Sequence, residues 1–162
     1  MSEQKIYPVP ASAAEGAHID AATYDTMYRR SVEDPDNFWA EQADQFLTWS
    51  KKWDTVQDWS YGEDDLHIEW FKGGRLNVAV NCIDRHLETR GDQTAIIWEG
   101  DEPTDSKNIT YRELHEQVSR FGSALRDLGV VKGDRVCIYM PMIPEATVAM
   151  LACARIGAVH SV

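Results

Sequence analysis

The clearest periodic pattern in the chain lies between residues 110 and 129 and predicts an amphipathic helix. Thr110 and Glu113 have the spacing of a capping box, in which each side chain bonds the backbone N–H of the other residue. Gly129 follows where a helix ends on a left-handed residue. The apolar residues between these ends recur at alternating spacings of four and three, and so share one helix face. They are Leu114, Val118, Phe121, Leu125 and Leu128.

The rest of residues 77–162 alternates between strand and helix patterns. Asn77 is a suitable N-cap for a helix that continues to about Arg90. The order predicted after it is strand 94–98, strand 108–110, the amphipathic helix, strand 135–140, helix 144–154 and strand 158–162. Short connections between such elements indicate right-handed crossovers. We therefore expect an α/β fold containing the first βαβαβ portion of a doubly wound, mainly parallel sheet.

The first 76 residues have a weaker pattern and predict a helical or irregular extension. Residues 1–19 are expected to be a flexible tail, and residues 20–32 a short helix. Asp34-Pro35 begins another helix, because proline suits the first helical position. We expect a loop over residues 47–65 and a short strand over residues 67–71. The second predicted helix presents on one side Phe38, Trp39, Gln42 and Phe46.

Composition and charge narrow the class of protein. The 162 residues are 43% hydrophobic, with a net charge of −11, which disfavours binding to nucleic acid or to an anionic membrane. Residues 1–76 hold 7 Lys/Arg against 15 Asp/Glu and five of the six tryptophans. This shift places a boundary near the 72–75 turn. We divide the chain into a tail (1–19), an acidic, Trp-rich extension (20–76) and the start of a larger domain (77–162).

The apolar runs, the cysteines and the last predicted elements indicate the compartment and whether the domain is complete. No apolar run is long enough for a signal peptide or a membrane span, so we expect a cytoplasmic protein. The three cysteines lack metal-binding spacing and are expected to be buried thiols: Cys82, Cys137 and Cys153. The last predicted helix is apolar on nearly all faces, and the last strand leaves an open edge. We therefore expect an incomplete domain, the N-terminal part of a larger protein.

Four groupings of residues are candidate sites, three of them polar, and each has a simpler structural interpretation. The Lys72-Gly73-Gly74-Arg75 turn lacks the spacing of a phosphate loop and is interpreted as a reversal into the next helix. Asp84, Arg85 and His86 are consecutive, so on a helix they point about 100° apart and cannot converge. Glu63-Asp64-Asp65 lacks the pattern of a calcium loop and is interpreted as solvated. Met140 and Met142 are expected to fill gaps in a core.

Two histidines, His115 and His160, lie on predicted elements in different surroundings. His115 lies beside Glu116 on the polar side of the amphipathic helix and is expected to be solvated. His160 lies near the end of a strand, where sheets of this class bind ligands, but a packed core histidine is the commoner case. Spacing alone assembles no nucleophile–base pair, metal set or phosphate cradle, so we name no catalytic, cofactor-binding or metal-binding residue.

Several longer runs resemble the acetyl-CoA synthetases, which are AMP-forming ligases of the adenylate-forming superfamily. The most specific are Asn81-Cys-Ile-Asp-Arg-His86 and the run from Met140-Pro-Met to His160-Ser-Val162. The Tyr111–Leu114 and Lys132–Val136 runs recur across the wider superfamily. The resemblance extends from about Tyr24 to Val162. It implies that the intact protein joins acetate to CoA through an acetyl adenylate, releasing AMP and diphosphate.

The resemblance also implies what this span does not carry. ATP, CoA and magnesium serve the intact enzyme, while the family's phosphate loop, nucleotide contacts and mobile lysine lie downstream of Val162. The span is then scaffold, inactive alone, and its partner is the missing C-terminal remainder. Two alternatives stay open: a propionyl-CoA or other short-chain acyl-CoA ligase, and a stand-alone, non-catalytic binding module. The acid preferred and the oligomeric state are not set by the sequence.

Overall fold

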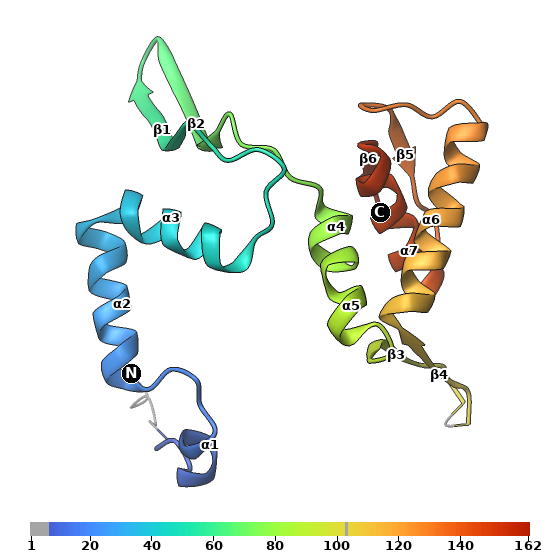
Figure 1. The fold of residues 1–162 in the computed structure, drawn as a ribbon, viewed down its shortest axis with the longest axis horizontal. Coiled ribbons are helices and arrows are strands. Elements are labelled where there is room, and N and C mark those ends of the chain that lie inside the picture. The colour runs from blue at the N-terminus through green and yellow to red at the C-terminus, as the bar shows by residue number, and fades with distance from the viewer. Residues whose placement is uncertain (1–6, 103) are drawn as a thin grey trace, which may run out of the picture. The chain divides into compact units, whose positions relative to one another are not determined.

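A computed structural model describes residues 7–102 and 104–162, which fall into two compact units divided between Gln45 and Phe46. The described part of the first unit contains α1 (Ala11–Glu15), α2 (Ala21–Glu33) and all but the last residue of α3 (Pro35–Phe46) (Figure 1). The side chain of Asp20 accepts a hydrogen bond from the Thr23 backbone and so caps α2. Both predicted helices of the extension are thus confirmed, and α1 lies within the predicted tail.

One arginine holds the corner between α2 and α3. Arg30 donates two 2.9 Å hydrogen bonds to the carboxylate of Glu41, and its guanidinium lies 6.0 Å from the ring centre of Phe38. Phe38 is buried. Trp39 and Phe46, which the spacing predicts on the same side of the helix, are exposed.

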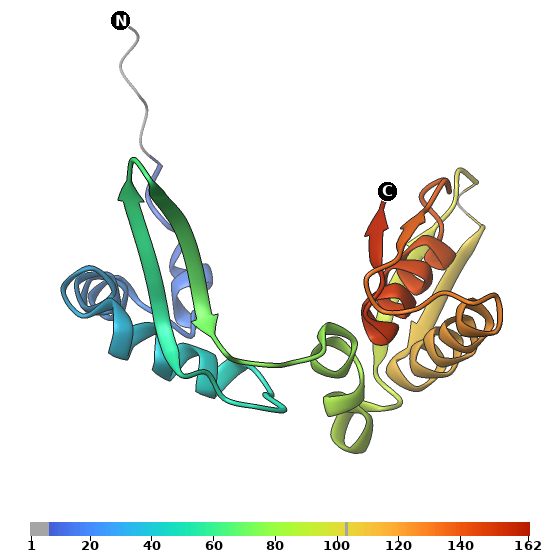
Figure 2. The same cartoon turned by 90° about the horizontal axis from the view of Figure 1, so that it is seen from above.

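The second unit begins with a β-hairpin that the sequence pattern predicted only in part. Strands β1 (Thr55–Gly62) and β2 (Asp65–Lys72) pair antiparallel, as the two long arrows of Figure 2 show. The loop predicted over residues 47–65 is therefore wrong for β1, while β2 confirms the predicted strand with wider bounds. One face of the hairpin carries five exposed apolar or aromatic residues: Trp59, Tyr61, Leu66, Ile68 and Trp70.

The remaining elements of the second unit surround the main core (Figure 1). They run in the order α4 (Val78–Cys82), η1 (Asp84–His86), α5 (Leu87–Arg90), β3 (Thr94–Glu99), β4 (Ser106–Thr110), α6 (Tyr111–Asp127), β5 (Arg135–Cys137), α7 (Pro144–Ile156) and β6 (Val159–Ser161). Helices α6 and α7 pack against each other. The buried apolar core consists of Ile83, Ile109, Leu114, Val118, Leu125, Val148, Ala152, Cys153 and Ala158.

The α/β class is confirmed, with a strand arrangement that differs in detail from the expected one. The described strands form three two-stranded sheets, and β5 and β6 are parallel, joined through α7 as a crossover. Strands β3 and β4 pair antiparallel, because the six residues between them are too few for a crossover connection. Gly157 ends α7 in the left-handed conformation at φ 78° and turns the chain into β6.

The amphipathic helix is confirmed as α6, capping box included. The Thr110 hydroxyl accepts from the Glu113 backbone, and the Glu113 carboxylate accepts from the Thr110 backbone at 2.8 Å. These bonds to the ionised carboxylate hold the pKa of Glu113 below its usual value. Gly129 has φ 91°, as its position after α6 predicted. Leu128 is wrong as a core residue, because it lies beyond the last turn and is exposed.

Two further expectations for this unit are corrected. The helix predicted from Asn77 to Arg90 is interrupted at Ile83, whose backbone angles (φ −127°, ψ −65°) are not helical. The interruption turns the Ile83 side chain fully into the core. Of the three cysteines expected to be buried, Cys153 is buried, whereas Cys82 and Cys137 are exposed. Burial raises the pKa of the Cys153 thiol.

Candidate functional site

The residue after the break at Ile83, Asp84, forms a bidentate contact with a distant arginine. Its carboxylate accepts hydrogen bonds from both terminal nitrogens of Arg155 at the end of α7, with N–O distances of 2.6 and 3.0 Å. Both side chains are mostly buried, with 27% of Asp84 and 21% of Arg155 exposed. A bidentate pair of this kind is stronger and more directional than an exposed ion pair. It ties η1 to α7 across 71 residues of sequence.

A histidine and an orphaned donor complete this cluster. His115 Nε2 of α6 lies 3.7 Å from the Asp84 Oδ1 atom, so three segments of the chain meet at one carboxylate. The Arg155 Nε atom is buried and has no hydrogen-bond partner among the described residues. His115 is half-buried against this carboxylate, which corrects the expectation that it is simply solvated.

Asn77 supports the same end of α7 from the other side. Its side-chain oxygen caps α4 by accepting from the Ala79 backbone at 2.9 Å, as the N-cap prediction required. Its side-chain amide donates to the carbonyls of Ala154 and Arg155 at 3.3 and 3.0 Å. These carbonyls belong to the last turn of α7, where backbone acceptors lack partners within the helix. One amide therefore satisfies groups on two helices.

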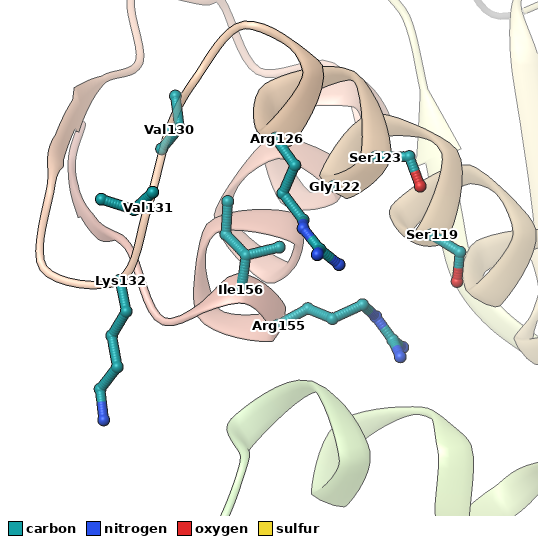
Figure 3. A pocket seen from close by; sticks show the side chains of 9 residues that line it. All are labelled: Ser119, Gly122, Ser123, Arg126, Val130, Val131, Lys132, Arg155 and Ile156. Atoms are coloured by element: carbon teal, nitrogen blue, oxygen red, sulfur yellow. The ribbon is translucent and has the colours of Figure 1, made fainter.

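A pocket of about 540 Å³ opens beside this cluster, between the ends of α6 and α7. Its walls carry two hydroxyls and three cationic side chains, and Figure 3 shows Arg126 and Arg155 extending toward the same opening as Ser119 and Ser123. Lys132 lies at the other end of the pocket. The complete lining is Ser119, Gly122, Ser123, Arg126, Val130, Val131, Lys132, Arg155 and Ile156.

The groupings singled out in the sequence do not form a site. Asp84, Arg85 and His86 diverge as predicted: Arg85 donates to the Phe46 carbonyl at 2.6 Å, and the His86 ring lies 5.1 Å from that of Tyr111. Burial, followed by the charges of the neighbouring arginines, lowers the pKa of His86. Spacing could not show that Asp84 would meet Arg155, because that contact depends on how α7 returns to η1.

The 72–75 turn is a plain reversal, as interpreted. Gly73 has φ 78°, and a Cβ atom there would lie 2.1 Å from the Asp54 carboxylate. An anion beside that carboxylate would be repelled, so the turn is unsuited to phosphate. Glu63 and Asp64 form the hairpin turn, and Asp65 is the first residue of β2.

His160, Met140 and Met142 are all exposed within this chain. The expected packing of Met140 and Met142 as core fillers is therefore wrong for the described chain, as is the core interpretation of His160. Among the described residues, no group of His, Cys, Asp and Glu side chains could hold a metal ion. No helix in the described part of the chain has the length and apolar composition needed to cross a membrane.

Comparison with known proteins gives these features a family. Residues 24–82 match the model of the acetyl-coenzyme A synthetase N-terminus, and residues 83–162 match that of the AMP-binding enzymes. The acetyl-coenzyme A synthetase of Halorhodospira halophila is 62% identical over the whole chain, and so is that of Alkalilimnicola ehrlichii. The chain belongs to the acetyl-coenzyme A synthetase family.

The similarity covers all of this chain but only part of its relatives. The chain spans 25% of the length of both acetyl-coenzyme A synthetases and corresponds to their N-terminal quarter. A solved structure of an acetoacetyl-CoA synthetase from Streptomyces lividans matches 93% of this chain and 23% of its own, with a TM-score of 0.76 and 35% identity. Asn77 lies in the segment that matches the acetyl-coenzyme A synthetase N-terminus, and Arg155 lies in the segment that matches the AMP-binding enzymes. The hydrogen bond from Asn77 to the Arg155 carbonyl therefore joins the two matched segments of this acetyl-coenzyme A synthetase family chain.

Proposed function

We propose that these residues are the N-terminal scaffold of an enzyme that joins acetate to CoA at the expense of ATP. The support is the 62% identity to acetyl-coenzyme A synthetases over the whole chain, at 25% of their length. The reaction would activate acetate as an acetyl adenylate with release of diphosphate, and the CoA thiol would then displace AMP. This activity belongs to the long protein, with acetate, ATP and CoA as its substrates and the cytoplasm as its compartment.

The domain division belongs to the same proposal. Residues 1–19 are a tail, residues 20–76 an extension typical of the family, and residues 77–162 the start of the large AMP-binding domain. The contacts that support a scaffold role are those that fix the end of α7. Asp84 and Asn77 both bind there, at residues four to five positions before the chain enters β6. They hold elements in place and present no group for chemistry.

Magnesium would offset the phosphate charges of ATP in such a ligase. The described residues offer no set of ligands for a metal ion, so we assign magnesium no ligand in this span. We likewise assign no catalytic residue to it and expect neither ATP nor CoA to bind this span alone at a site that serves the reaction. The remainder of the long protein, which makes up three quarters of the relatives' length, would supply these sites.

Acetate-dependent ATP–pyrophosphate exchange tests the proposal directly. The assay compares the 162-residue chain with the product of the uninterrupted reading frame, each with acetate and with propionate. We expect exchange from the long product only, and faster with acetate. Faster exchange with propionate would reassign the enzyme to the short-chain acyl-CoA ligases. Exchange by the 162-residue chain would refute the scaffold role. If neither protein catalysed exchange, a non-catalytic binding module would be favoured.

A further inference from the structure

We propose that the pocket between the ends of α6 and α7 binds the phosphate group of a small anion. Its walls bring together Arg126, Lys132 and Arg155 from three separate segments of a chain whose net charge is −11. None of the nine residues that line it is acidic. A local excess of cations in an acidic protein focuses a positive potential on one opening.

The charges and hydroxyls at this opening are available to a ligand. Arg126 and Lys132 form no ion pair within the described residues, and the hydroxyls of Ser119 and Ser123 have no hydrogen-bond partner there. Ser119 and Ser123 are one turn apart on α6 and point to the same opening as the Arg126 guanidinium (Figure 3). Guanidinium and hydroxyl donors together match the oxygens of a phosphate group.

Arg155 has a different part in the site. Its terminal nitrogens are held by Asp84 at 2.6 and 3.0 Å, so its charge is largely neutralised and its position is fixed. Arg126 therefore supplies the main charge, because the Lys132 side chain extends away from the opening that Arg126, Ser119 and Ser123 share. Val130, Val131 and Ile156 give the pocket apolar walls, which suit the organic part of a phosphate ester.

If Arg126 and Arg155 only stabilise helix ends and bind no ligand, the expected results differ. Arg126 and Arg155 each lie in the last turn of a helix, where a cation offsets the partial negative charge of the helix end. If that were their whole function, replacing Arg126 would lower stability, but no anion would bind in a saturable way. The distinguishing observation is therefore saturable binding that is confined to these residues.

Titration of the 162-residue chain followed by amide chemical shifts tests the site. The probes are inorganic pyrophosphate and phenyl phosphate, added at constant ionic strength with sodium chloride as the reference. We expect saturable shifts at Ser119, Ser123, Arg126 and Lys132, with half-saturation at about 1 mM or below. Tighter binding of phenyl phosphate would indicate a phosphate ester as the ligand, and tighter binding of pyrophosphate would indicate a free polyphosphate. The titration needs no acetate, ATP or CoA, so its result is independent of the ligase activity.

Matched variants localise the binding. Arg126→Gln should weaken it about tenfold or more, because it removes a charge-assisted contact. Arg135→Gln removes the same charge from an exposed residue outside the pocket and should leave the affinity unchanged. Ser123→Glu keeps α6 helical and places a negative charge in the opening. It should abolish binding of the anion. Shifts that are linear in concentration and spread over the chain, or equal losses in Arg126→Gln and Arg135→Gln, would overturn the proposal.

Discussion

Replacing Asp84 by asparagine tests whether the contact with Arg155 holds the second unit together. The substitution keeps the size of the side chain but removes its charge, leaving the Arg155 guanidinium only 21% exposed and without its partner. Fully buried pairs cost about 3–5 kcal/mol when one partner is removed, and exposed pairs about 0–1 kcal/mol. For a pair exposed by 21–27%, we expect a loss of about 2–3 kcal/mol in the free energy of unfolding.

Urea denaturation followed by far-UV circular dichroism measures this loss. Asp92→Asn is the matched control, because Asp92 also pairs with an arginine, Arg112, at 3.1 Å, but is 90% exposed. It should change stability by less than about 0.5 kcal/mol. A double-mutant cycle of Asp84→Asn with Arg155→Gln should give a coupling energy of about 1.5 kcal/mol or more. If Asp84→Asn and Asp92→Asn proved equally mild, or the coupling vanished, the pair would not hold α7.

Two further predictions concern the hairpin and the turn after α7. Hydrogen bonding to Asp58 and then to Asp65 raises the pKa of His67 above its ordinary 6.5. Protonated His67 therefore stabilises the hairpin below pH 6.5, and this stabilisation is lost as the pH rises through the folded pKa. In NMR titrations, Asp58→Asn should return the pKa of His67 toward 6.5, whereas Asp64→Asn should not; equal values in both variants would contradict the assignment. Gly157→Ala should destabilise by about 2 kcal/mol in urea titrations, more than Gly129→Ala, because both glycines have positive φ but only at Gly157 does a Cβ meet Lys132, at 2.9 Å. Equal losses would show that backbone strain alone sets the cost.

Local signals in the sequence were sufficient for the ends and faces of α6. Thr110, Glu113 and Gly129 act on residues at most four positions away, so their spacing fixes the cap and the stop. The same holds for the start of α4 at Asn77 and for the turn at Gly73. Specific runs of residues also carried the family resemblance, which the whole-chain identity confirms.

Contacts between distant residues decided the features that the pattern missed. Strand β1 contains few aliphatic residues, and it forms by backbone hydrogen bonding and side-chain pairing with β2, which no local period reveals. The pocket exists only because the ends of α6 and α7 meet.

The break at Ile83 shows most clearly how tertiary contacts override local sequence signals. Residues 77–90 have the pattern of one helix, and local propensity favours continuing it. Tertiary structure interrupts it, because burying Ile83 and pairing Asp84 with Arg155 compensate for the helical hydrogen bonds that are lost. The sequence by itself therefore determined most of the helices after residue 20, the ends of α6 and the family resemblance, but neither β1 nor the break at Ile83. Only the packing of α7 against η1 decided which polar groups meet, since that energy depends on residues 71 positions apart.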